Sequence, residues 1–238
     1  MSARRALRVA ALFVAACLPQ PICAQGVLFG VKGGVPISSY FEGSLTGTPI
    51  RDTEIVPALR RYTVGLAMEW RSEAGVGAEF DVLYKRAHYA LTSGGFRSGS
   101  GELFRETSDT AVNSWDFPML LKYRFGGPVS PFATSGVALR HIGPAGQRGT
   151  ETIRNLITGT TTVTIIDTDN PPELTKRNYA GLVVGAGFEV GADRVRFLPE
   201  FRYTGWLNSI PLMTTHQTEF LLGIVFEFGR RRQPPDNP

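Results

Sequence analysis

The feature that most constrains this chain is a strict alternation of apolar and polar residues, repeated in segments of about ten residues. The last segment, EFLLGIVFEF at 219–228, shows it most clearly. One face runs from Phe220 to Phe228 and holds only Phe, Leu and Ile, whereas the opposite face begins with Glu219 and ends with Glu227. Side chains alternate between the two faces of a strand, so the pattern predicts β-strands rather than helices.

Eight segments carry this pattern, and they predict strands at 26–35, 61–70, 76–86, 114–125, 131–140, 179–190, 195–204 and 218–228. Strands of soluble domains usually run about 5–6 residues, whereas about 9–11 tilted residues cross a bilayer. No uninterrupted apolar run after the first residues is long enough for a membrane-spanning helix, which needs about 18 residues.

The connections between these segments alternate in length. Short ones lie at 71–75, 126–130 and 191–194, and long ones rich in Gly, Ser, Thr and Pro lie at 36–60, 87–113, 141–178 and 205–217. Outer-membrane barrels have short periplasmic turns and long outer loops. We therefore predict an all-β fold, an eight-stranded antiparallel up-and-down transmembrane β-barrel over residues 25–228. In the longest loop, TGTTTVTIIDTDNPPE predicts a hairpin above the membrane.

The two faces of the predicted strands differ sharply in charge. In seven strands one face has no charged residue; the register of 131–140 stays open. The other face carries the predicted interior charge network Lys32, Glu69, Glu79, Asp81, Lys85, Lys122, Arg124, Glu189, Arg196, Glu200 and Arg202, together with Asp116, Glu219 and Glu227. Gly, Ala and Leu separate these charges, which favours a narrow barrel interior where opposite charges pair.

Three functions are compatible with these faces. Paired charges predict a plugged or very narrow polar interior and a structural or surface-interaction protein. The same charges lining an open path would give a small-solute channel. With the faces inverted, the chain would be a secreted, soluble, lipocalin-like binder of an apolar ligand.

Aromatic residues gather near the ends of the predicted strands. We expect these to lie at the two membrane–water interfaces, where a ring with one polar edge is stable: Trp70, Trp115, Tyr203, Trp206 and Phe228. Pro118 and Pro199 interrupt strands, and a closed barrel has no free edge for a residue without an N–H donor. Both prolines therefore predict a bulge or a local break in pairing.

The first 24 residues have the layout of a signal peptide, with early arginines, a short apolar run and small residues ending at Ala24. Cleavage there removes both cysteines, Cys17 and Cys23, and three arginines, which lowers the net charge from +4 to +1. Lipoprotein processing at Cys17 is the alternative. An exported chain with this small charge gives no indication of nucleic-acid binding.

Seven pieces resemble the small bacterial outer-membrane β-barrel domain family in their order and wording: FGVKGGVPIS, EFDVLYKR, WDFPMLLKYRF, PFATSGVAL, GLVVGAGFEV, PEFRYTGWLNS and EFLLGIVFEF. The resemblance covers nearly all of 26–228. It implies a porin-like eight-stranded barrel of OmpA/OmpX type in the outer membrane, a lipid environment and usually no assigned activity. It also implies a terminal aromatic read by the barrel insertion machinery, here Phe228. The residues after it, 229–238, depart from that pattern and are expected to form a periplasmic tail.

No pattern in the chain predicts chemistry. His88, His141 and His216 lack ligand-like spacing, and VGAGFEV at 184–190 has no helix after it to make a dinucleotide site. We therefore expect no enzyme activity, catalytic residue, metal or cofactor, and a monomer. The sequence names no ligand, receptor or solute.

Overall fold

The computed structural model describes residues 26–39, 45–48, 51–57, 61–72, 74–97, 99–127, 129–169, 171, 177–192, 194–207 and 214–228. The predicted signal peptide at 1–24 and the predicted tail at 229–238 lie outside these residues. Every regular element among them is a β-strand. None of them forms a helix long and apolar enough to cross a membrane.

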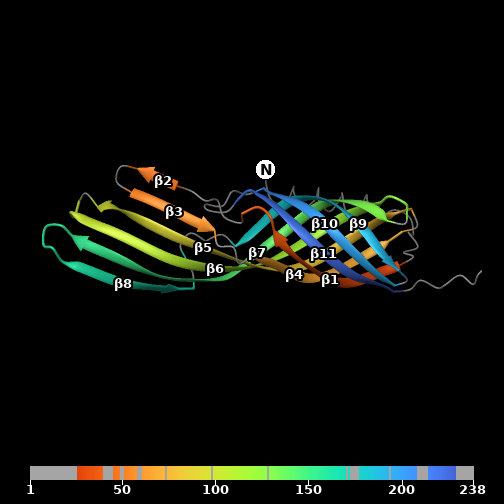
Figure 1. The fold of residues 1–238 in the computed structure, drawn as a ribbon, viewed down its shortest axis with the longest axis horizontal. Helices are drawn as coiled ribbons and strands as arrows, with labels where there is room; N and C mark the ends of the chain where they lie inside the picture. Colours follow the sequence, from red (N-terminus) through yellow and green to blue (C-terminus); the bar gives the residue numbers. More distant parts are fainter. Residues whose placement is uncertain are drawn as a thin grey trace, which may run out of the picture.

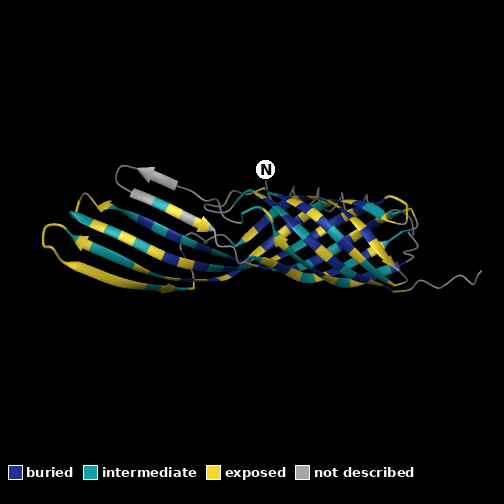
Figure 2. Ribbon diagram, in the orientation of Figure 1, coloured by how far each residue is buried: buried dark blue, intermediate teal, exposed yellow. Residues whose placement is uncertain are grey.

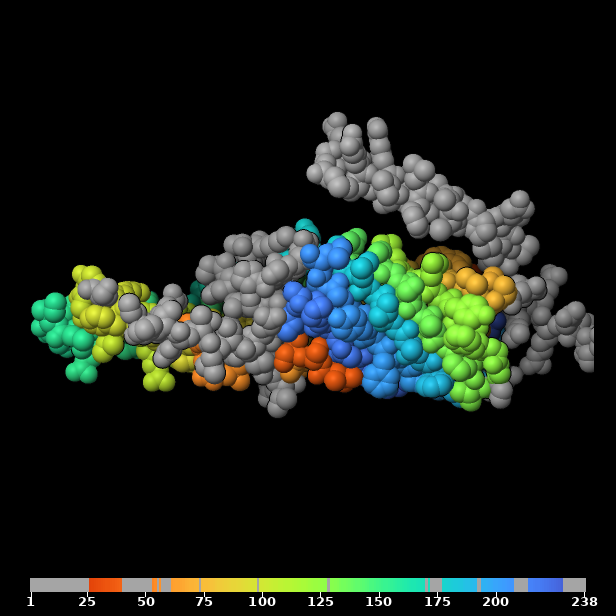
Figure 3. Space-filling view, turned by 90° about the horizontal axis from the view of Figure 1, so that it is seen from above, coloured from red at the N-terminus to blue at the C-terminus, as the bar shows by residue number. Residues whose placement is uncertain are grey.

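Eight strands close into a ring, which confirms the predicted barrel (Figure 1). They are β1 (Gly26–Pro36), β4 (Tyr62–Arg71), β5 (Val76–Arg97), β6 (Glu102–Arg124), β7 (Ser130–Asn155), β9 (Asn178–Ala192), β10 (Val195–Trp206) and β11 (His216–Phe228). Each pairs antiparallel with the strand before and after it, and β1 pairs with β11 from Val27↔Phe228 to Pro36↔Glu219. Figure 3 shows the first and last strands side by side in the barrel wall.

Two glycines of β1 allow its backbone to pack closely against β11. A Cβ on Gly30 or Gly34 would overlap a backbone carbonyl of β11, that of Ile224 or of Phe220 respectively. The short turn after β4 has a different requirement, because Gly75 has a φ of 77°, which L side chains rarely adopt.

The two faces of the barrel are separated as predicted. Burial alternates residue by residue along the strands and gives the chequered wall of Figure 2. Large apolar side chains such as Leu66, Leu121 and Phe201 are exposed on the outside, whereas Lys32, Asp81 and Glu200 are buried inside. The lipocalin-like alternative required the reverse and is wrong.

Three strands are much longer than predicted. The expectation that 87–113 and 141–178 are loops is wrong for most of their length, because β5, β6 and β7 continue through them as a protruding sheet (Figure 1). A hairpin of β2 (Leu45–Thr48) and β3 (Arg51–Pro57) pairs with β5 there, and β8 (Thr161–Thr168) pairs with β7 as the expected hairpin. Ladder hydrogen bonds between neighbouring strands organise these Gly- and Thr-rich stretches. One face of the sheet is also buried, as at Ala87, Tyr89 and Thr110.

Both strand prolines lie beside gaps in one ladder, without a change of register. The β5–β6 pairing omits Pro118 between Phe80↔Met119 and Leu83↔Asp116, and the β9–β10 pairing likewise omits Pro199. On the other side each proline stays in register, opposite Ala138 and Leu222 respectively. The predicted local break is confirmed. The irregularity in β6–β7 lies elsewhere, between Val112 and Ser114.

Leu222 tests which medium covers the outer face. Its side chain is 45% exposed in the middle of β11. We expect Leu222→Arg to lower the free energy of unfolding by about 2–4 kcal/mol in lipid vesicles, because a charge would face the bilayer midplane. Denaturant titration of the folded protein in vesicles measures this.

The matched control is Ile165→Arg on β8, where the side chain is 79% exposed on the protruding sheet. It should change stability by less than about 0.5 kcal/mol. Equal effects of the two substitutions would contradict the assignment of the barrel face to lipid.

Candidate functional site: the ionic interior of the barrel

The barrel interior is filled by charged side chains from every strand of the ring. Inside the barrel, ion pairs join eight acidic and eight basic side chains of the described ring strands, so the formal charges of these sixteen balance. The acids are Glu69, Glu79, Asp81, Asp116, Glu189, Glu200, Glu219 and Glu227, and the bases are Lys32, Arg71, Lys85, Lys122, Arg124, Arg140, Arg196 and Arg202. Each of the eight acids lies within ion-pair distance of at least one base.

The central layer is built around Glu79. This carboxylate pairs with Lys32, with Lys122 at 2.8 Å and with Arg202 at 3.0 Å. Asp81 accepts from Lys32 at 3.1 Å and from Arg202 at 2.9 Å. The layer thus joins β1, β5, β6 and β10 across the barrel lumen.

Glu200 completes the central layer from β10. Its carboxylate lies 3.2 Å from Lys32 and 2.9 Å from Arg202, and the Thr134 hydroxyl donates to it at 3.3 Å. Three acids and three bases therefore share one buried cluster. Buried charges need such pairing, because an unpaired ion in a low-dielectric interior is costly.

A second layer lies toward the short turns, at the end of the barrel away from the protruding sheet. Glu69 pairs with Arg124 and lies 3.0 Å from Lys122, which also contacts the central layer. Glu189 lies 2.6 Å from Arg124 and 2.8 Å from Arg71. Lys122 therefore bridges two layers, and its ammonium lies 4.1 Å from the Phe132 ring centroid.

A third layer lies toward the protruding sheet. Asp116 accepts from Arg140 at 2.7 Å and pairs with Lys85 at 2.9 Å, and Lys85 contacts Glu219 at 2.5 Å. Gln217 accepts from Arg140 at 2.7 Å. Above this layer the Arg140 guanidinium lies 4.0 Å from the Trp206 ring centroid.

All eleven residues of the predicted interior network lie on the inward face, with Arg196 half-buried and the others buried. The sequence reading missed Arg140 and Phe132, both inward on β7, because Ala, Ser, Thr and Gly alternate there without a clear apolar face. It also missed the polar partners Thr63, Thr134 and Gln217, whose inward position follows once the strand registers are fixed.

Four of the five predicted interface aromatics face outward: Trp70, Tyr203 and Phe228 near strand ends, and Trp115 in the middle of the long strand β6. Their contact with the membrane interface stays a prediction. The prediction for Trp206 is wrong, because this side chain is 8% exposed and points inward against the guanidinium of Arg140. The predicted strand ended at 204; extending its alternation by two residues places Trp206 on the face of Arg202.

The histidines that the structure describes lie outside these layers. His216 stacks on Tyr203 at the outer end of the wall, His141 contacts Asn178, and His88 lies on the protruding sheet. Within the described ranges, no three His, Cys, Asp or Glu side chains are grouped to hold a metal ion.

The central layer gives a direct stability test. We expect Glu79→Gln to lower the free energy of unfolding by about 3–5 kcal/mol, because it leaves buried cations with an unbalanced charge. Denaturant titration measures it, with Glu151→Gln as control. Glu151 pairs with Arg97 at 3.1 Å on the exposed protruding sheet, where a pair contributes about 0–1 kcal/mol. A neutral Glu79→Gln would show that the central layer is hydrated rather than dry.

Comparison with known proteins gives a family and several structural likenesses. The family model for the outer membrane protein beta-barrel domain matches residues 21–210. No curated protein matches the chain.

Solved structures similar to the chain include Ail, the attachment invasion locus protein of Yersinia pestis, at 12% identity and a TM-score of 0.38, covering 85% of this chain and 97% of that one. The Neisserial surface protein A is similar at 13% identity and a TM-score of 0.39, and the match covers 86% of this chain and 97% of that one. The outer membrane protein OprG of Pseudomonas aeruginosa is similar at 13% identity and a TM-score of 0.44, and the match covers 86% of this chain and 96% of that one.

Proposed function

Because the chain belongs to the outer membrane protein beta-barrel domain family, we propose that it is a non-enzymatic surface protein whose ion pairs plug the barrel. As a family member it resides in the bacterial outer membrane, and its uncharged outer face meets lipid. The protruding sheet of β2, β3, β5, β6, β7 and β8 is the part that extends outward to meet other molecules.

One observation carries the proposal that the interior is plugged. Three layers of paired side chains cross the lumen, and the central pairs are fully buried, with side-chain exposures of 0–2% for Lys32, Asp81, Glu200, Arg202 and Glu79. An eight-stranded barrel leaves room only for side chains to fill. A path for ions would have to break several charge-assisted hydrogen bonds at once.

The remaining parts of the proposal concern export and assembly. Residues 1–24 act as a cleaved signal peptide, and the insertion machinery reads Phe228, which is 59% exposed at the end of β11. The tail at 229–238 then lies in the periplasm, and the closed ring needs no partner to satisfy its strands, so the protein works as a monomer.

Planar-bilayer conductance separates this function from a small-solute channel. We expect the wild-type barrel to give no steady conductance. The double variant Glu200→Ala, Arg202→Ala keeps the interior charge balanced and removes two side chains from the central layer, so it should give discrete conductance steps. Steady wild-type conductance, equal to that of the double variant, would favour the channel.

A further inference from the structure

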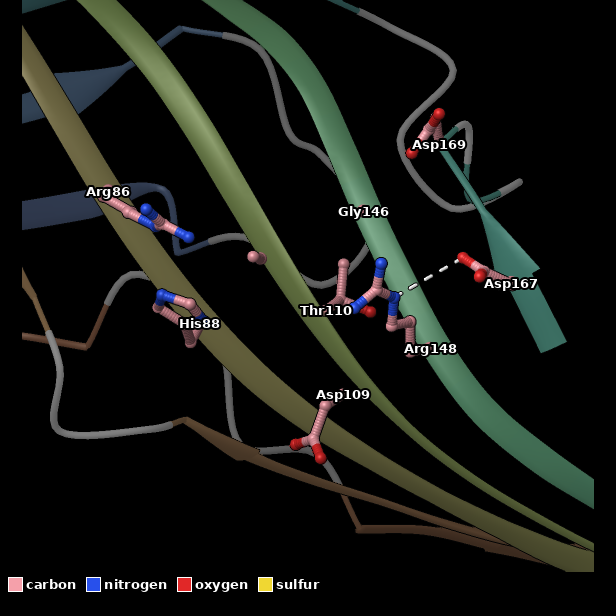
Figure 4. Close-up of a pocket in the computed structure, with 9 residues that line it drawn as sticks. Arg86, His88, Asp109, Thr110, Gly146, Arg148, Asp167 and Asp169 are labelled. Atoms are coloured by element: carbon pink, nitrogen blue, oxygen red, sulfur yellow. Dashed lines mark ion pairs between the residues drawn. The ribbon is translucent and has the colours of Figure 1, made fainter. Parts of the chain in front are cut away.

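A polar pocket lies outside the barrel, where the protruding sheet leaves the wall. It has a volume of about 310 Å³ and is built by four neighbouring strands, β5, β6, β7 and β8 with the residue that follows it (Figure 4). Its charged residues take no part in the ionic interior, because they lie on the opposite, outward face of the sheet.

Small residues in the middle of the sheet make this face hollow. Cross-strand pairing sets His88 opposite Ala111, and Ala111 opposite Gly146. A Cβ added to Gly146 would meet only the Asp169 Oδ1, at 4.0 Å. Ala111 and Gly146 therefore form an open floor between taller side chains on either side.

The walls of the pocket carry opposite charges. Arg86 and His88 line one side from β5, and Asp167 and Asp169 line the other (Figure 4). Arg148 stands between Asp109 and Asp167 in the cross-strand row, and it lies 3.6 Å from Asp167. A ligand that fits both sides has an anionic group at the Arg86 end and hydrogen-bond donors at the aspartate end.

The position of the pocket relative to the lipid-facing surface of the barrel indicates which kind of ligand can enter the pocket. On the same outward face, just before the pocket, Tyr84 and Trp115 pack with ring centroids 5.2 Å apart, and the Tyr84 hydroxyl donates to Asn113 at 2.8 Å. Such aromatics mark the interface, where the hydrocarbon core ends.

The height above these rings follows from strand geometry. Arg86 and His88 follow Tyr84 by two and four residues. At about 3.3 Å per residue and a tilt of about 40°, they stand roughly 5–10 Å above it. The head-group layer occupies about the next 5–8 Å beyond the hydrocarbon. The pocket therefore opens sideways onto lipid head groups.

We propose that this pocket binds the phosphorylated sugar head group of a lipid in the surrounding membrane. The phosphate lies against the guanidinium of Arg86 and the imidazole of His88, since guanidinium groups bind phosphate oxygens in a bidentate fashion. Sugar hydroxyls donate to the carboxylates of Asp109 and Asp169. Ala111 and Gly146 leave the space in which the sugar ring sits.

The test uses the full-length mature chain, folded in maltoside micelles and titrated with lipid A, a phosphorylated disaccharide lipid. Native mass spectrometry counts the bound lipid, and intrinsic tryptophan fluorescence follows the titration. We expect one bound lipid A per chain. Both Arg86→Gln, which removes the phosphate contact, and Gly146→Leu, which fills the floor without changing charge, should weaken binding at least tenfold.

Arg105→Gln is the matched control. Arg105 is exposed on the same outward face, opposite Gly94 and Thr152 and farther from the barrel than the pocket. Its replacement removes the same charge and should leave the affinity unchanged.

Four outcomes would overturn the proposal: no binding of lipid A, equal binding of a dephosphorylated lipid A, equal weakening by Arg105→Gln, or full binding by Gly146→Leu. Soluble glucosamine 1-phosphate serves as a second probe for the source of the ligand. Weaker binding of this sugar supports a membrane lipid, whereas binding as tight as that of lipid A would assign the pocket to a solute and overturn the lipid source.

Discussion

The whole structure depends on the pairing of the first strand with the last. A sheet in lipid cannot leave an edge, because each unpaired backbone N–H or C=O group costs several kcal/mol where there is no water. The β1–β11 ladder, from Val27↔Phe228 to Pro36↔Glu219, removes the only edges that the eight-stranded ring would otherwise have. Gly30 and Gly34 make this seam possible, since any side chain there would collide with the backbone of β11.

Closure also decides where the charges go. A closed ring of alternating residues has one face toward lipid and one toward a narrow lumen, so each strand must place its charges inside. The formal charges of the eight acids and eight bases in the ion pairs balance, and Lys122 and Arg124 bridge neighbouring acids across strands. The two prolines are tolerated because each interrupts only one of its two ladders.

The sequence was sufficient to predict the eight-stranded ring and most of the side chains in its interior, because alternation with a period of two shows directly which face of a strand a residue occupies. It failed where that signal is weak. β7 carries small residues on both faces of its barrel part, so Arg140 and Phe132 could not be assigned inward from that strand alone. The outer halves of β5, β6 and β7 are held by ladder bonds between Gly- and Thr-rich segments, whose composition is that of loops. Trp206 lies two residues beyond the predicted end of its strand at 204, so the alternation that turns it inward did not reach it in the sequence.

The central claim is that β11 has lipid on one side and an ionic lumen on the other, and residue-by-residue accessibility tests it most directly. The two cysteines, Cys17 and Cys23, lie within the predicted signal peptide, so single cysteines can be introduced into a cysteine-free mature chain. Spin labels at successive positions from Leu221 to Phe226, in vesicles, should show high access to lipid-dissolved oxygen at Leu222, Ile224 and Phe226. Access should be low at Leu221, Gly223 and Val225. Uniform access along the strand, or alternation with the opposite phase, would contradict the account.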